Sequence, residues 1–190
     1  MIVDNSVSPP FSVMETSAEL LYLLKFDKDN KFGFIDEFEK SECLQWLFFW
    51  HGSGAPYQGN LGFFRRAAEK LPCKSRPPFL AASHSIILTH LLTTKVAIER
   101  FRKETARVFG VLEIRLSGKY TGEPRDYLAG KDKGKYSIAD IGTWTWVKNY
   151  SISGYTEEEM KEFPHLVKWV NRIAERPAVK RGIGEKYKNQ

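Results

Sequence analysis

Cysteine is scarce in this sequence of 190 residues, which contains only Cys43 and Cys73. The two form no CxxC motif and no spacing typical of metal ligands, which argues against a disulfide scaffold and against a zinc site. Free cysteines are the rule in reducing compartments. We therefore expect a reduced, cytoplasmic protein without a metal.

Long apolar runs are also missing. The most apolar stretch, from Phe79 to Leu92, is too short to span a bilayer. It contains His84 and His90, but no further residues at the spacing of metal ligands accompany them. The first 13 residues lack the basic and apolar regions of a secretory signal. We expect neither a membrane span nor a metal centre.

No block of one charge sign occurs, although the net charge is +6. Basic residues mostly alternate with acids, as in the segment IERFRKETAR, and this pattern favours solvated helix faces over a nucleic-acid groove. Nucleic acid is therefore not an expected partner. Apolar residues make up 42% and aromatics 14% of the chain, a composition that suits a packed helical core.

The beginning of the chain predicts a β-hairpin that leads into a helix. Strands are expected at 2–4 and 11–14, with a turn formed by polar residues and prolines between them. Thr16 and Glu19 have the spacing of a capping box and predict a helix that starts near Thr16. Two strands and one helix cannot bury a core alone. We therefore expect residues 1–30 to need further secondary-structure elements to complete a hydrophobic core.

From Asp36 onward the apolar spacing is helical. A first helix has apolar residues on one side, is bent at residues 51–56 and continues to Leu71. Further helices are predicted at about 95–117, 137–148 and 162–175, with an exposed loop at 122–135 and a stop at Pro177. The helix that begins near Asp36 is predicted from the spacing of Phe38, Cys43, Trp46, Leu47 and Trp50. The helix at about 95–117 is predicted from the spacing of Ile98, Phe101, Thr105, Val108, Leu112 and Leu116. The fold class is mainly α.

The segment YSIADI, residues 136–141, has the pattern of a strong helix start. Ser137 can cap the free amides of the helix and Asp140 can accept from the Ser137 amide, which makes a capping box. The following residues are almost uncharged, so the helix is expected to be central and buried. We interpret Ser137 and Asp140 as structural caps without a chemical role.

Three segments together resemble the C-terminal domain of glutathione transferases. They are residues 126–150, which include YSIAD, residues 162–182, which end in RPAVKRG, and residues 41–60, SECLQWLFFWHGSGAPYQGN. The likeness is greatest to the fungal nu-class group related to the nitrogen-regulator prion protein. It implies an all-α domain over 36–190, preceded by a remnant (hairpin plus helix, 1–30) of a thioredoxin-like domain.

The resemblance also implies a glutathione site. SVMETSAELLYLL resembles the family segment in which a Glu-Ser pair holds the γ-glutamyl end of glutathione; Glu15 matches the Glu and Thr16 the Ser. A carboxylate can pair with the γ-glutamyl ammonium, and helix N-terminal amides can hold its carboxylate. The alternative is that Thr16 only caps its helix and that Glu15 is only an acid of the first turn.

Trp46, Trp50 and Tyr57 lie on the helix that, in the family, borders the pocket for the electrophile. Core packing explains these residues almost as well. The resemblance implies attack of the glutathione thiolate on hydrophobic electrophilic small molecules, in detoxification or secondary metabolism, and pairing into a homodimer. The alternatives are a non-catalytic interaction module and a chain that does not fold stably.

Two features depart from the family pattern. The family's thiol-activating residue precedes the strand that matches residues 2–4, where this sequence starts, so no catalytic residue is predicted. In addition, residues 74–95 form an atypical insertion of 22 residues. Cys73-Lys74-Ser75 can be encoded by a splice-donor sequence, and we hypothesise a translated intron; a functional loop is the alternative.

Overall fold

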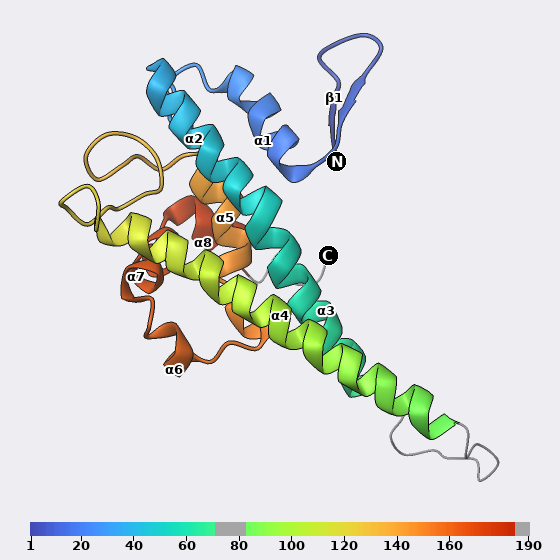
Figure 1. Ribbon diagram of the computed structural model, residues 1–190. Helices are drawn as coiled ribbons and strands as arrows, with labels where there is room; N and C mark the ends of the chain where they lie inside the picture. The colour runs from blue at the N-terminus through green and yellow to red at the C-terminus, as the bar shows by residue number, and fades with distance from the viewer. Residues whose placement is uncertain (71–82, 185–190) are drawn as a thin grey trace.

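The computed structural model describes the backbone of residues 1–70 and 83–184, and the side chains of residues 1–66 and 94–184 (Figure 1). Two short strands, β1 (Ile2–Asp4) and β2 (Phe11–Val13), pair antiparallel with Ile2 opposite Val13. They lead into α1 (Thr16–Leu23), which the 3₁₀ turn η1 (Leu24–Phe26) extends. The Tyr22 hydroxyl donates to Asp4 Oδ2 at 2.6 Å and thereby ties the hairpin to α1.

A long bent helix follows, made of α2 (Glu37–Phe49), the π-helix η2 (Trp50–Gly54) and α3 (Ala55–Lys70). Asp36 caps it by accepting from the amides of Phe38 at 3.1 Å and Glu39 at 3.0 Å. The predicted bend is confirmed, and its cause is the wider π turn. The predicted apolar stripe holds at Cys43, Leu47 and Trp50 but not at Phe38, which is exposed because it lies in the first turn, beyond the core.

The next helix, α4 (Ser83–Ser117), starts twelve residues before the predicted start at Lys95. No glycine or proline interrupts residues 83–109, so the helix has no reason to begin later. Its predicted stripe is confirmed, with Val108, Leu112 and Leu116 fully buried. Of the proposed insertion at 74–95, residues 74–82 lie outside the described part and 83–95 belong to α4, so the intron hypothesis stays untested.

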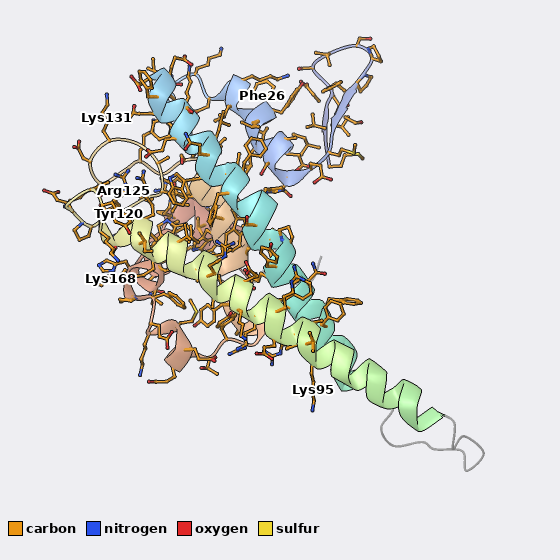
Figure 2. All side chains as sticks on the ribbon, in the orientation of Figure 1. Phe26, Lys95, Tyr120, Arg125, Lys131 and Lys168 are labelled. Carbon is orange, nitrogen blue, oxygen red and sulfur yellow. The ribbon has the colours of Figure 1, made fainter. Side chains whose placement is uncertain are left out.

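The loop after α4, predicted to be exposed at 122–135, is exposed at 122–124 and 131–133 but buried in its middle. Leu128 and Ala129 are fully buried, and Arg125 is 7% exposed (Figure 2). The Arg125 guanidinium donates to the carbonyl oxygens of Asp132, at 2.7 Å, and Gly130. The sequence did not predict the buried middle, because an internal arginine can satisfy loop carbonyls that otherwise need water.

The rest of the chain forms α5 (Ile138–Val147), η3 (Tyr150–Ser153), α6 (Glu157–Met160), α7 (Pro164–Ala174) and α8 (Pro177–Gly182). The predicted end of the helix before Pro177 is confirmed, because α7 ends at Ala174. Pro177 then begins the short helix α8, since proline is well accommodated in the first helical turn. The predicted Ser137–Asp140 capping box is confirmed: the Ser137 amide donates to Asp140 Oδ2 at 3.0 Å.

The core lies around α5, which packs against α2, α1 and α7, while α4 packs against α3 and α7. The hairpin and α1 stand at one side of this helical body (Figure 1). The fold is mainly helical with a small two-stranded sheet at its beginning, as predicted. Within the described residues, no helix has the length and apolarity needed to cross a bilayer.

Candidate functional site

The backbone of Glu15, directly before α1, has an unusual conformation. Its φ of 71° and ψ of 118° place it in a region that non-glycine residues rarely occupy. Such a conformation costs on the order of 1–3 kcal/mol and persists at positions where function or packing requires it. Glu15 is also exposed, so buried packing of its side chain does not explain the strain.

The predicted Thr16–Glu19 capping box is wrong. Glu15, not Thr16, occupies the N-cap position, and no side chain caps the helix. The Glu19 carboxylate instead pairs with the Met1 amino group at 2.7 Å. The reason is the backbone turn at Glu15, which starts the helix one residue earlier than the T-x-x-E pattern assumes. The alternative reading of Thr16 as the cap of its own helix is thereby removed.

The start of α1 presents free backbone donors. The first intrahelical bond runs from the Glu19 amide to the Glu15 carbonyl at 2.8 Å. By helix geometry the amides of Thr16, Ser17 and Ala18 precede that bond and have no acceptor within the helix. Together with the helix dipole, they form a place for a carboxylate. The exposed hydroxyl of Thr16 and carboxylate of Glu15 lie at the same helix end.

A buried side-chain pair fixes this helix end to the bend of the long helix. Ser17 is 4% exposed, and its Oγ lies 2.8 Å from Nδ1 of His51. His51 belongs to η2, and π turns of this kind are frequent at functional sites. Gly54 makes the turn compatible with the core, because a Cβ there would lie 2.3 Å from Cε3 of the buried Trp50.

The three predicted electrophile-pocket residues do not come together. Trp50 is fully buried in the core. Trp46 packs against Phe49 and under the Arg115 guanidinium, whereas Tyr57 packs against Phe101. Trp46 and Tyr57 therefore face α4, three helical turns apart. Their role at a ligand site stays a prediction.

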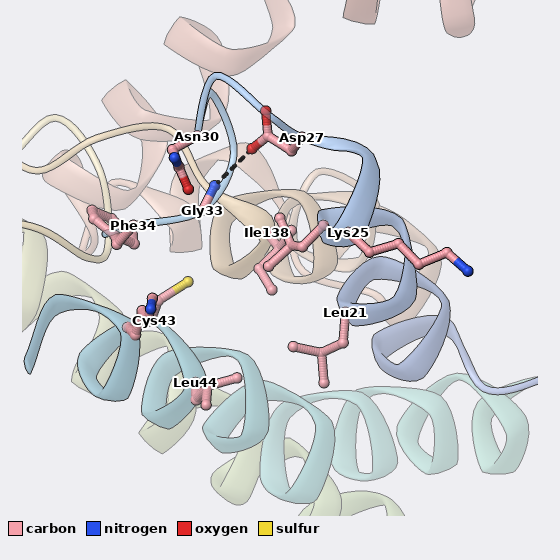
Figure 3. Close-up of a pocket in the computed structure, with 11 residues that line it drawn as sticks. Leu21, Lys25, Asp27, Asn30, Gly33, Phe34, Cys43, Leu44 and Ile138 are labelled. Atoms are coloured by element: carbon pink, nitrogen blue, oxygen red, sulfur yellow. Dashed lines mark hydrogen bonds between the residues drawn. The ribbon is translucent and has the colours of Figure 1, made fainter. Parts of the chain in front are cut away.

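One cavity of about 380 Å³ lies between α1, the linker at 27–34 and α2 (Figure 3). The cavity walls are mostly apolar: Leu21, Leu24, Phe34, Leu44 and Ile138. The sulfur of Cys43 points toward this space, and burial raises the pKa of the Cys43 thiol. A buried thiol with a raised pKa is a poor nucleophile. The walls suit an apolar group, and the charged residues Lys25, Asp27 and Lys40 also line the cavity.

A second cavity of about 400 Å³ lies between α3, the end of α5 and η3. Gln58, Gly59 and Gly62 of α3 face Trp146 and Ile152 across it. Arg66 is the charged residue of its lining. Among the residues whose side chains are described, no group of three or more metal-binding side chains occurs at either cavity or elsewhere.

Residues 69–177 match the sequence profile of the glutathione S-transferase C-terminal domain, which covers more than half of the chain. The chain belongs to the glutathione S-transferase family. A GST-like protein of Streptococcus mutans is 33% identical over 98% of this chain, and the match covers 60% of that protein. A disulfide-bond oxidoreductase of Escherichia coli, YfcG, is 32% identical over 93% of this chain and 67% of its own length.

Among solved structures of the family, Ure2p5 from Phanerochaete chrysosporium is similar, with a TM-score of 0.64 and 32% identity over 90% of this chain and 67% of that one. It was crystallised with 1-(S-glutathionyl)-2,4-dinitrobenzene. This chain spans 52–67% of the length of the first three curated relatives that it matches.

The family resemblance pointed to Glu15 and Thr16, but not to Ser17 and His51. Ser17 has the same short polar side chain as many helix-start residues, and His51 lies 34 positions away. Nothing in their spacing signals that α1 packs across the bend of the long helix. The one available hint was HGSG itself, because two glycines in a helical segment often mark a close approach.

Proposed function

We propose that this chain binds glutathione at the start of α1 and takes part in glutathione-dependent chemistry. The observation that carries the proposal is the strained, uncapped helix start at Glu15. A residue held at φ 71°, before helix amides that no side chain caps, is a costly arrangement with no structural benefit of its own. A ligand that uses both the amides and the carboxylate explains it.

The γ-glutamyl group fits these donors and acceptors. Its α-carboxylate can accept from the free amides near Thr16 and Ser17 and from the Thr16 hydroxyl. Its ammonium can pair with the Glu15 carboxylate, which the strained backbone holds beside the helix end. The Ser17–His51 contact at 2.8 Å keeps the helix end in place and does not itself touch the ligand.

We favour conjugation of glutathione to a hydrophobic electrophile as the reaction of the whole protein. The similarity to Ure2p5, crystallised with a glutathionyl-dinitrobenzene, supports this choice and the assignment to the fungal nu-class group. Thiol–disulfide exchange is the second candidate, because two relatives at 30% and 32% identity are disulfide-bond oxidoreductases. Both reactions use the same bound tripeptide, so the binding test precedes the choice between them.

Isothermal titration calorimetry with ligand fragments tests the proposal. Glutathione and γ-glutamylcysteine should bind with similar affinity, and cysteinylglycine, which lacks the γ-glutamyl group, should not bind. Glu15→Gln keeps the size of the side chain but removes its charge, and should weaken glutathione about tenfold or more. Glu37→Gln, at an exposed acid of α2, is the matched control and should leave the affinity unchanged.

Two results would contradict the proposal. One is equal binding of glutathione and cysteinylglycine. The other is equal glutathione affinity of the wild-type chain and Glu15→Gln. A chain that melts cooperatively and binds no glutathione, but retains a protein partner, would support the alternative of a non-catalytic interaction module.

A further inference from the structure

The cavity between α1, the linker at 27–34 and α2 has the size and the walls of a small-molecule site. Its volume of about 380 Å³ lies in the lower part of the range for ligand pockets, roughly 300–1,000 Å³. A Cβ added at Gly33 would lie 3.3 Å from Leu24 Cδ2, so the glycine keeps space free beside that leucine. The apolar lining consists of Leu21, Leu24, Phe34, Leu44 and Ile138. An aliphatic chain bound here would leave water together with these side chains.

The two lysines that line the cavity already have partners. Lys25 Nζ donates to Asp4 Oδ2 at 2.9 Å and lies 3.5 Å from the centroid of the Tyr22 ring. Its side chain extends away from the cavity (Figure 3). Lys40 Nζ donates to Glu37 Oε1 at 2.6 Å. A ligand carboxylate would therefore have to compete with existing anions for either ammonium group.

The carboxylate of the lining, Asp27, is bound by the linker itself. Its Oδ2 accepts from the amides of Phe32 at 2.7 Å and Gly33 at 3.2 Å, and its Oδ1 accepts from the Lys31 amide at 2.9 Å (Figure 3). These backbone hydrogen bonds, above all that of Phe32, hold the pKa of Asp27 below its usual value. Asp27 is therefore an anion that repels a ligand carboxylate, and a ligand ammonium would compete with three amides for it.

Asn30 supplies the neutral polar group of the lining. Its backbone has a φ of 50°, a left-handed conformation that asparagine tolerates. Its carbonyl oxygen accepts from Lys135 Nζ at 2.8 Å, whereas its side-chain amide has no bond to the described part of the chain. A carboxamide offers both a donor and an acceptor, and a hydroxyl group offers the same pair.

We propose that this cavity is a binding site for a small neutral aliphatic molecule that carries one hydroxyl group. The aliphatic chain lies against the leucines, Phe34 and Ile138, and the hydroxyl bonds to the Asn30 amide. The cavity uses Leu21 and Leu24, in the last part of α1 and just after it, whereas Glu15 and Thr16 lie at its start. The site therefore does not depend on the proposed glutathione site.

Titration with 1-octanol, without glutathione, tests the site. The ¹H–¹³C resonance of the Ile138 δ1 methyl group, assigned with Ile138→Val, should shift and give the dissociation constant. Asn30→Gly removes the amide but keeps the left-handed backbone, which glycine adopts readily. It should raise the dissociation constant about fivefold, equivalent to about 1 kcal/mol. Asp132→Gly, at a left-handed residue with a φ of 52° in the loop after α4, is the matched control and should bind like the wild type.

Charged analogues and a cavity-filling variant separate the contacts. Octanoate and octylammonium have a similar chain, but each should bind about tenfold more weakly than 1-octanol, because a charged group loses water without gaining a free partner. Leu44→Trp should fill the cavity and abolish the shift of the Ile138 methyl resonance. If Leu44→Trp fails to melt cooperatively, Asn30→Gly and the charged analogues still decide.

Three results would overturn the proposal. The first is an Ile138 methyl resonance that does not shift at millimolar 1-octanol. The second is equal affinity of Asn30→Gly and the wild type for 1-octanol. The third is tighter binding of octanoate than of 1-octanol, which would make the lysines, and not Asn30, the polar contact of the cavity.

Discussion

Asp140 is the residue with the most demanding environment in the structure. It is fully buried, and its two carboxylate oxygens accept from the Ser137 amide and hydroxyl, the Leu128 amide and the Trp169 indole. Burial raises the pKa of Asp140 to about 6, although these hydrogen bonds oppose the rise. The residue therefore joins three segments of the chain, and its charge is costly at neutral pH.

Stability should depend on pH through Asp140. An unfolded aspartate has a pKa of 3.8, whereas in the folded state the pKa of Asp140 is about 6, so the folded protein binds the proton more tightly. The resulting stabilisation is complete below pH 3.8 and is lost as the pH rises through 6. The loss amounts to about 3 kcal/mol, at about 1.4 kcal/mol per pKa unit.

Urea denaturation between pH 4 and 7 measures this effect. Asp140→Asn cannot ionise, so the difference in unfolding free energy between variant and wild type should shrink as the pH rises. At pH 4 the variant should be less stable than the wild type, because its amide group meets the Ser137 donor and costs about 1–3 kcal/mol. A difference that stays constant over this pH range would contradict the raised pKa.

At the scale of single residues, the sequence pattern predicted interactions between residues that are close together in the chain. Ser137 and Asp140 are three residues apart, so their capping box was readable from the sequence. Thr16 and Glu19 have the same spacing, yet no box forms, because the strained turn at Glu15 shifts the helix start. The indole bond from Trp169 to Asp140, at 2.9 Å, could not be predicted, since it needs α7 to pack on α5.

Among the elements, the long bent helix determines where the candidate sites lie. The π turn η2 carries His51, which contacts Ser17 of α1, and the following helix α3 carries Gln58 of the second cavity. The sequence predicted a bend from HGSG but not its type, because a π turn differs from a break only in hydrogen bonding. The early start of α4 was missed for a related reason: weak amphipathicity hid an uninterrupted helix.

The two glycines of η2 should respond oppositely to alanine. A Cβ at Gly54 would lie 2.3–2.6 Å from ring atoms of the buried Trp50, whereas a Cβ at Gly52 would meet nothing within 4 Å. Gly54→Ala should therefore lower the free energy of unfolding by about 1–3 kcal/mol, since the core cannot accommodate the overlap. Gly52→Ala should raise it by about 0.5–1 kcal/mol through helix propensity.

Chemical denaturation of both variants, with near-ultraviolet circular dichroism of the tryptophans, checks the pair. The same chemical change at two positions two residues apart makes each variant the control of the other. Equal effects of both substitutions would show that the Trp50 ring is not held against the turn.

At the scale of the whole molecule, the hairpin and α1 are attached to the helical body by few contacts. Ser17 is the buried residue of α1, whereas α5 has seven buried residues. Apart from Ser17–His51, α1 reaches the body through residues such as Leu20, which would contact a Cβ at Gly142 at 3.5 Å. The stability of a segment follows the apolar area and hydrogen bonds that hold it. We therefore expect two levels of stability in one chain.

Native-state hydrogen exchange should separate these levels. Amides of β1, β2 and α1 should exchange through local opening at a lower free energy than amides of α5 and α7, which should open only with global unfolding. Ser17→Ala removes a buried hydrogen bond of about 1 kcal/mol and should speed exchange in the hairpin and α1 about fivefold without changing α5. Ser41→Ala, at an exposed serine of α2, should change neither segment. Equal opening energies across the chain would mean that the hairpin, α1 and the helical body unfold as one unit, and a Ser17→Ala effect on α5 would place the Ser17–His51 contact in the global core.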